Sequence, residues 1–142
     1  MSRILAIDYG FKRTGIAVTD PGRMIAGGLQ TVHTKDLFPF LKDYIAKEDV
    51  DCIVFGMPTR DDGSDSEPVP HIKGAMKKCR KLFPDLLVDS HDESYTSIMA
   101  FQSMIEGGVK MKKRRDKALV DKISATLILQ SYMKEKINKT QT

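Results

Sequence analysis

Hydrophobic and polar positions divide the chain into strand-like and helix-like segments. Residues 3–8 contain four successive apolar side chains and end at Asp8, a pattern typical of a buried strand. Residues 14–19 are rich in β-branched side chains and follow a short loop, so they predict the second strand of a hairpin. Residues 24–32 supply a third strand after a turn signal at residues 20–22. The chain therefore opens with a predicted antiparallel meander.

Helical periodicity begins after these three strands. Apolar residues recur at three- and four-residue spacing from about residue 35 to residue 47, which predicts an amphipathic helix. Residues 51–56 form a short apolar strand of the kind found inside a sheet that is covered on both faces. The remaining pattern predicts a helix within residues 68–83, a strand at 86–90, and helices at about 95–106 and 116–136.

The order of these elements predicts an α/β fold. We expect one five-stranded mixed sheet, with three antiparallel strands followed by two parallel strands, flanked by helices. A length of 142 residues corresponds to a single ordinary domain. We assign residues 1–138 to that domain and residues 139–142 to a polar tail.

Composition places the chain among ordinary globular proteins, with 41% hydrophobic and 30% charged residues. No apolar run is long enough to cross a bilayer, and the first residues lack the features of a signal peptide. The two cysteines and three histidines show neither a disulfide framework nor the spacing of zinc ligands. We expect a reduced, cytoplasmic protein that does not contact a membrane.

Acidic residues occur where predicted elements begin or end. Asp8 closes the first strand, Asp92 and Glu93 closely follow the fifth, and Asp121 lies near the start of the last helix. Ligands of α/β proteins collect beyond the carboxyl ends of the strands, so we expect Asp8 and Glu93 to converge. Asp121 shares a helix face with small and then apolar side chains, which lets the helix approach the sheet closely. These side chains are Ser124, Ala125, Ile128 and Leu129.

Three carboxylates brought close together would repel one another unless a cation lay between them. Mg²⁺ and Mn²⁺ prefer such oxygen ligands, and a pair of these ions can promote phosphodiester hydrolysis. Each acid also has a local interpretation. Asp8 could be a turn residue, and the others could be acids favoured near helix N-termini. The metal hypothesis explains all of them together, and we prefer it.

Basic residues cluster just before the helix that carries Asp121. The net charge is +4, and the cluster comprises Lys110, Lys112, Lys113, Arg114 and Arg115. Such a cluster is either a solvated loop or a contact surface for a nucleic acid backbone, and its position beside Asp121 favours the second. Lys12 and Arg13, in the loop after Asp8, are either phosphate contacts or solubilising charges at a hairpin tip.

Motifs that match one protein family occur in order from residue 4 to about residue 133. They are IDYGFKRTGIA at 7–17, residues 55–58 with 62–64, Asp92-Glu93 followed by Thr96-Ser97, and residues 112–114, 120–125 and 128–132. The set resembles the YqgF family, Holliday-junction-resolvase-like nucleases of pre-16S rRNA that have a ribonuclease H-like fold.

This resemblance implies a divalent-metal-dependent nuclease acting in 5′-end maturation of the 16S rRNA precursor, with two Mg²⁺ or Mn²⁺ ions when substrate is bound. By position, the catalytic and metal-binding acids are Asp8, Glu93 and Asp121, with Asp92 as a neighbour that could exchange roles with Glu93. The implied partner is nucleic acid, with precursor rRNA favoured over branched DNA. The small ribosomal subunit is a further candidate partner, and the chain is expected to be a monomer or homodimer.

One position departs from the family pattern, because Ser94 stands where an Arg normally follows the acid pair. Serine cannot replace the bidentate pairing of arginine with phosphate, so substrate contacts are affected more than metal binding. Two other hypotheses therefore stay open: a catalytically silent nucleic-acid-binding protein, and a DNA junction resolvase on the same fold. An actin-like phosphotransferase would need two such lobes, and 142 residues provide one.

Overall fold

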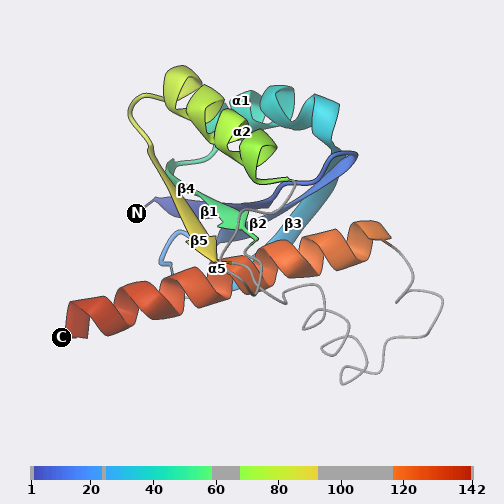
Figure 1. Ribbon diagram of the computed structural model, residues 1–142. Helices are drawn as coiled ribbons and strands as arrows, with labels where there is room; N and C mark the ends of the chain where they lie inside the picture. The colour runs from blue at the N-terminus through green and yellow to red at the C-terminus, as the bar shows by residue number, and fades with distance from the viewer. Residues whose placement is uncertain (1, 24, 59–67, 93–116, 142) are drawn as a thin grey trace.

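A single sheet lies at the centre of the protein (Figure 1). The computed structural model describes residues 2–23, 25–58, 68–92 and 117–141, the last of these ranges with side chains from 118 to 136. In chain order the elements are β1 (Arg3–Asp8), β2 (Arg13–Thr19), β3 (Ala26–His33), a 3-10 turn (Thr34–Asp36), α1 (Leu37–Lys47), β4 (Val50–Met57), α2 (Val69–Leu82), β5 (Leu87–Asp92) and α5 (Lys117–Gln141).

The sheet has five strands in the order β3-β2-β1-β4-β5. β2 is antiparallel to both β1 and β3, whereas β4 is parallel to both β1 and β5. The predicted mixed sheet is therefore confirmed, with three antiparallel strands followed by two parallel ones. Because β1, β4 and β5 run in the same direction, they end at one edge of the sheet, called here the carboxyl edge.

Helices cover both faces of the sheet. In Figure 1, α1 and α2 lie on one side, and α5 crosses the other. Alternate residues of a strand point to opposite faces, and β4 shows this clearly. Its Ile53 and Phe55 belong to the core under α1 and α2, whereas Cys52 and Val54 belong to the core under α5. The predicted coverage of this apolar strand on both faces is confirmed.

Helix α5 packs closely on the sheet where two residues of its buried stripe are small. Ser124 and Ala125 are completely buried, and Ile128 and Leu129 continue the buried stripe one turn later. Gly28 of β3 faces this helix, and Thr31 donates a hydrogen bond from Oγ1 to a backbone carbonyl of α5 at 2.5 Å. The helix face predicted from the sequence is therefore the face that contacts the sheet.

Several boundaries differ from those expected. The fifth strand continues through Asp92 instead of ending at residue 90, because it pairs with β4 as far as Met57. Helix α5 extends through Gln141, beyond the expected end at 136, so it includes residues 139–141 of the polar tail. No glycine or proline interrupts that stretch. The helix expected at 95–106 lies outside the described residues. Among the helices that are described, none is long and apolar enough to cross a membrane.

Candidate active site

Asp8 is the last residue of β1 and lies at the carboxyl edge. It has the same parity along the strand as Ile4 and Ala6, whose side chains belong to the core under α5. Alternation therefore places Asp8 on the face covered by α5. Its directly paired neighbour on β2 is Gly15.

Gly15 brings α5 against this part of the sheet. A Cβ atom at Gly15 would lie 2.1 Å from the carbonyl oxygen of Asp121, so the helix backbone occupies the space that any larger side chain would need. Directly paired residues in an antiparallel ladder have Cα atoms about 4.5–5.5 Å apart. Asp121 is thus next to Gly15, and Gly15 is next to Asp8. The fold brings these two predicted acids together, although they are far apart in the sequence.

A cationic side chain contacts one of these acids. Arg13 is the first residue of β2 and lies two residues before Gly15. Both therefore lie on the face covered by α5. Its Nε donates a hydrogen bond to Asp121 Oδ2 at 3.1 Å, and the two side chains are 36% and 25% exposed. Because both groups are partly removed from water, the ion pair is stronger than one fully exposed to solvent. The sequence did not indicate this contact.

The loop between β1 and β2 carries the predicted Lys12, which is exposed. Thr34, at the start of the 3-10 turn, fixes this loop. Its backbone N–H donates to the Lys12 carbonyl at 2.9 Å, and its Oγ1 donates to the Gly10 carbonyl at 2.6 Å. Its Oγ1 is also 2.9 Å from the Oγ1 of the fully buried Thr14. Thr34 therefore positions the loop that follows Asp8, and no sequence motif pointed to it.

Strand pairing places Asp92 on a different face of the sheet from Asp8 and Asp121. Asp92 is paired with Met57, which packs against the core under α1 and α2. Residues that pair directly across a sheet point to the same face, so Asp92 lies on the face opposite Asp8. The other predicted site residues lie outside the described residues: Glu93, Lys110, Lys112, Lys113, Arg114 and Arg115.

Asp89 and His91 alternate with Asp92 along β5, so they lie on the face of the sheet that α5 covers. Asp89 Oδ2 accepts a hydrogen bond from the hydroxyl of Tyr132 in α5 at 2.9 Å. His91 contacts the same helix through its Nε2, 2.8 Å from Ser131 Oγ, and its Nδ1, 3.0 Å from Glu135 Oε2. These contacts fix β5 against the helix that carries Asp121.

The donor chemistry fits a hard divalent cation. Asp8 and Asp121 supply carboxylate oxygens at one edge and on one face of the sheet, and such oxygens are the ligands that Mg²⁺ prefers. The guanidinium of Arg13 already neutralises part of this negative charge. Within the described ranges, no three histidine, cysteine, aspartate or glutamate side chains form a metal-binding group.

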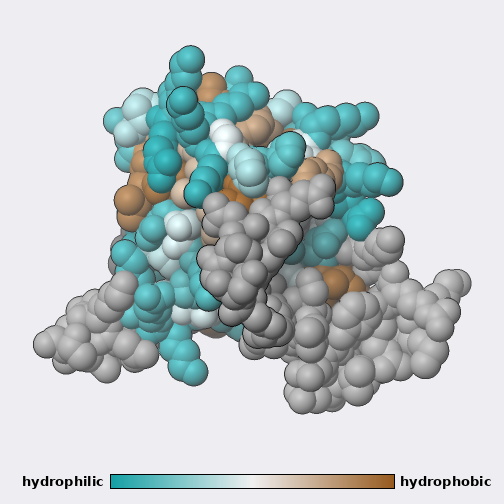
Figure 2. All heavy atoms as spheres, viewed as in Figure 1, coloured by the Kyte–Doolittle hydropathy of each residue, from teal (hydrophilic) through white to brown (hydrophobic). Residues whose placement is uncertain are grey.

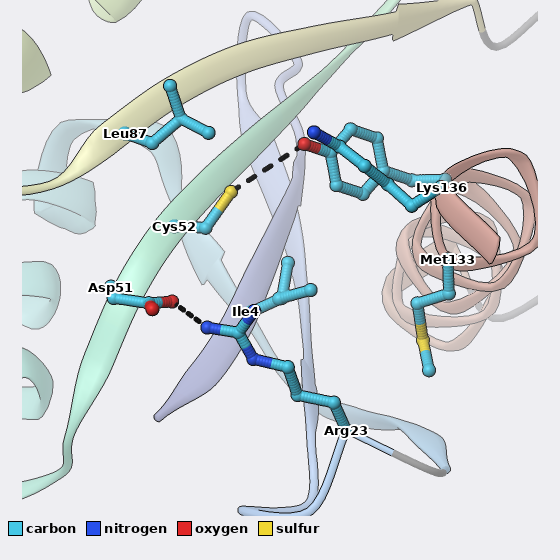
Figure 3. Close-up of a pocket in the computed structure, with 8 residues that line it drawn as sticks. Ile4, Arg23, Asp51, Cys52, Leu87, Met133 and Lys136 are labelled. Atoms are coloured by element: carbon cyan, nitrogen blue, oxygen red, sulfur yellow. Dashed lines mark hydrogen bonds and ion pairs between the residues drawn. The ribbon is translucent and has the colours of Figure 1, made fainter. Parts of the chain in front are cut away.

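A pocket of about 390 Å³ lies elsewhere, beside the starts of β1, β4 and β5 and the second half of α5 (Figure 3). Arg23 and Asp51 form an ion pair across it, and Cys52 Sγ lies 3.8 Å from the hydroxyl oxygen of Tyr132. Burial raises the pKa of the Cys52 thiol. This pocket is at the opposite edge of the sheet from Asp8, so it is not part of the candidate site.

Comparison with known proteins identifies close relatives in sequence. The family model RuvX, described as Holliday junction resolvase, matches residues 2–135. A protein of Christiangramia forsetii is 54% identical over 135 residues, covering 95% of this chain and 100% of the relative. A protein of Phocaeicola vulgatus is 51% identical over 136 residues, covering 96% and 98%. Both relatives bear the name "Putative pre-16S rRNA nuclease".

Solved structures show the same fold at low sequence identity. The Holliday junction resolvase of fowlpox virus aligns with a TM-score of 0.54 at 12% identity, covering 94% of this chain and 98% of that one. Its complex with Holliday junction DNA aligns with a TM-score of 0.53 at 13% identity, covering 94% and 97%. The expected ribonuclease H-like fold is therefore confirmed. Together with the match over residues 2–135, the relatives show that this chain belongs to the RuvX (YqgF) family of nucleases.

Proposed function

We propose that this protein is a divalent-metal-dependent nuclease that cuts precursor 16S rRNA during maturation of its 5′ end. The observation that carries the proposal is the approach of Asp8 and Asp121 across Gly15, on one face and at one edge of the sheet. The names of its relatives support the choice of RNA substrate. This substrate in turn implies a cytoplasmic protein that meets the small ribosomal subunit.

Asp8 and Asp121 would hold the metal together with Glu93. We assign Glu93 rather than Asp92 because Asp92 lies on the face of the sheet opposite Asp8. When bound, Mg²⁺ or Mn²⁺, as one ion or a pair, would activate the attacking water and stabilise the leaving oxygen. The protein's own contribution is to fix the carboxylates in place before substrate arrives.

Arg13 has a distinct role in this proposal. While it is paired with Asp121, its guanidinium limits the repulsion between the two acids. With a divalent cation held by Asp121, Arg13 would be able to bind a phosphate oxygen of the substrate instead. It would then supply, from β2, an arginine contact of the kind that Ser94 lacks. Lys12 and the basic residues 110–115 would add further phosphate contacts, which hold the strand without reading its sequence.

A DNA junction resolvase is the second candidate function. The description of the matching family and the shared fold with the fowlpox virus resolvase favour it. Metal-dependent hydrolysis of the phosphodiester bond would be the same in both cases, because the fold does not determine the substrate. The two functions differ in which nucleic acid fits against the carboxyl edge.

The test is the variant Asp8→Asn, compared with Asp43→Asn on the exposed surface of α1. An amide is a poor ligand for Mg²⁺ or Mn²⁺, so Asp8→Asn should lose cleavage and Mn²⁺ binding. Asp43→Asn has the same chemical change away from the edge and should keep both. Cleavage is measured on a precursor rRNA fragment and on a four-way DNA junction, with Mn²⁺ binding measured by calorimetry.

Preferential cutting of the rRNA fragment supports the proposed substrate, and preferential cutting of the junction supports the resolvase. Wild-type activity in a folded Asp8→Asn variant would refute the assignment of Asp8. Nucleic acid binding without any metal-dependent cleavage in the unmodified protein would instead indicate a catalytically silent binding protein.

A further inference from the structure

Helix α2 presents a concentration of positive charge that the proposed active site does not use. From residue 68 to residue 84 the chain has five lysine or arginine residues and no acidic residue. All five side chains are exposed: Lys73, Lys77, Lys78, Arg80 and Lys81. The surface over α2 is accordingly hydrophilic (Figure 2). A helix that only needed to cover the sheet would not require charge of a single sign.

The helical positions of these cations divide them into two groups. Lys78 and Arg80 turn toward neighbouring elements: Lys78 Nζ lies 4.2 Å from the centroid of the Phe38 ring, and Arg80 donates to the Val88 carbonyl at 3.2 Å. Lys77 and Lys81 lie opposite the buried side of the helix, and Lys73 continues their line toward its start. Successive members are four residues apart, which is a rise of about 6 Å along the axis. The outer face of α2 therefore carries an evenly spaced row of positive charge.

The row begins beside the candidate active site. Phe11 lies in the loop that follows Asp8, and the residue is 57% exposed. Its ring packs edge-to-face with His71, in the first turn of α2, with ring centroids 4.8 Å apart and an interplanar angle of 79°. The contact joins the start of α2 to the loop of the candidate site. It also supports the Phe11 ring while the residue stays exposed to solvent.

We propose that Phe11 and the outer face of α2 form one contact surface for a single strand of nucleic acid. In this arrangement a base stacks on Phe11, and the phosphates of the same strand follow Lys73, Lys77 and Lys81. An aromatic platform next to a line of cations is the combination that recognises unpaired nucleic acid. An acidic protein surface would make no comparable use of the exposed ring. The inference rests on the proposed nuclease function and deepens it, because it specifies an unpaired substrate segment next to the carboxyl edge.

Stacking and phosphate contact have different experimental signatures. Each lost phosphate contact reduces the magnitude of the negative slope of log affinity against log salt by about 0.7 for a single strand. A lost stacking contact weakens binding by about tenfold or more with little effect on that slope. Base pairing withdraws a base from stacking on a protein ring, so the second effect should be confined to unpaired substrates.

The first experiment compares two double variants of the full chain. Lys77→Ala/Lys81→Ala removes two cations from α2, and Lys47→Ala/Lys134→Ala removes two exposed cations from α1 and α5. Binding of a fluorescent single-stranded RNA is followed by anisotropy over a range of salt concentrations, with EDTA present so that no strand is cut. The α2 variant should lower the magnitude of the salt slope by about 0.7 per lysine, while the control leaves it near the wild-type value. Equal slopes in the two variants would overturn the proposal.

The second experiment isolates the ring. Phe11→Ala should weaken binding of the single strand by about tenfold or more, and Phe11→Tyr, which keeps the ring, should restore it. Neither variant should alter binding of a perfectly paired duplex of the same length. An equal loss on duplex and single strand, or no loss on either, would exclude stacking by Phe11. If the α2 variant instead lost binding to anionic vesicles while its RNA affinity stayed at the wild-type value, a membrane would replace nucleic acid as the partner.

Both measurements are made without metal, so they assess this surface independently of catalysis. If the wild-type protein shows no Mn²⁺-dependent cleavage but the α2 and Phe11 variants lose RNA binding as expected, the nuclease proposal fails and the contact surface stands. If cleavage is normal and these variants bind like wild type, the contact surface fails and the nuclease proposal stands.

Discussion

A single methyl group at Gly15 is expected to push helix α5 away from the sheet. A Cβ atom there would lie 2.1 Å from the carbonyl oxygen of Asp121 and 2.4 Å from its carbonyl carbon, whereas real Cβ atoms essentially never approach closer than 3.0 Å. The helix must therefore move by roughly 1 Å at this point. Both contacting atoms belong to the backbone, so no side-chain rotation can relieve the clash.

The size of the effect follows from this displacement. Forcing extra volume into a well-packed interface costs about 1–3 kcal/mol in the free energy of unfolding, and each kcal/mol lowers Tm by about 2–4 °C in a domain of this size. Activity should fall further than stability, because Asp121 itself lies at the clash. A catalytic group displaced by about 1 Å can cost about 100-fold in rate.

Two other glycines provide matched controls. A Cβ at Gly27 meets nothing within 4 Å, whereas one at Gly28 meets Lys122 Cγ at 2.7 Å and Thr126 Oγ1 at 3.2 Å. These are side-chain atoms that can move. Thermal melting and metal-dependent cleavage should therefore show little change for Gly27→Ala, an intermediate loss for Gly28→Ala and the largest loss for Gly15→Ala. A Gly15→Ala protein that melts and cleaves like Gly27→Ala would refute the reasoning.

Two further predictions concern buried polar atoms. Ser124 Oγ is buried without a hydrogen-bond partner in the part of the chain that the structure describes. Ser124→Ala should therefore leave the free energy of unfolding unchanged or raise it by up to about 1 kcal/mol in urea titrations, and a clear loss would indicate a hidden partner. Burial raises the pKa of the Cys79 thiol from 9.0 to about 12, so the folded state keeps a proton that the unfolded chain loses, and stability should fall as pH rises through that interval. At pH 9, iodoacetamide should label Cys79 far more slowly in the folded protein than in urea, as measured by mass spectrometry, and equal rates would contradict its burial.

The convergence of Asp8 with Asp121 was accessible from the sequence because each depends on a local pattern. An apolar run that stops at Asp8 marks the end of a buried strand. Small residues on the helix face of Asp121 indicate close packing against the sheet. The parallel strands β1, β4 and β5 end at the same edge of the sheet. This shared edge leaves few positions where the two acids could lie.

The position of Asp92 could not be predicted in the same way. His91 and Asp92 looked like the start of a loop after the fifth strand, because they lack a strand's apolar character. In the structure the two ring nitrogens of His91 contact Ser131 and Glu135 of α5, forty or more residues later in the chain. The strand therefore continues, and its register with β4 places Asp92 on the face opposite Asp8.

The contacts of Arg13 and Thr34 were also inaccessible. Each joins segments whose relative placement is known only after the sheet and α5 have packed. The charge of α2 was visible as a count of residues. Its relation to Phe11 was not, because that relation depends on the packing of His71 against the loop after Asp8.

The late position of α5 in the chain has a consequence for the newly made protein. All five strands leave the ribosome before this helix. The apolar sheet face formed by Ile4, Ala6 and Val54 is therefore exposed to solvent at first. Asp8 then has no Asp121 beside it, so a product that terminates before α5 exposes this apolar face and, under the proposed function, lacks one of its metal-binding acids. Under the proposed function, nuclease activity would therefore arise only after α5 has packed on the sheet.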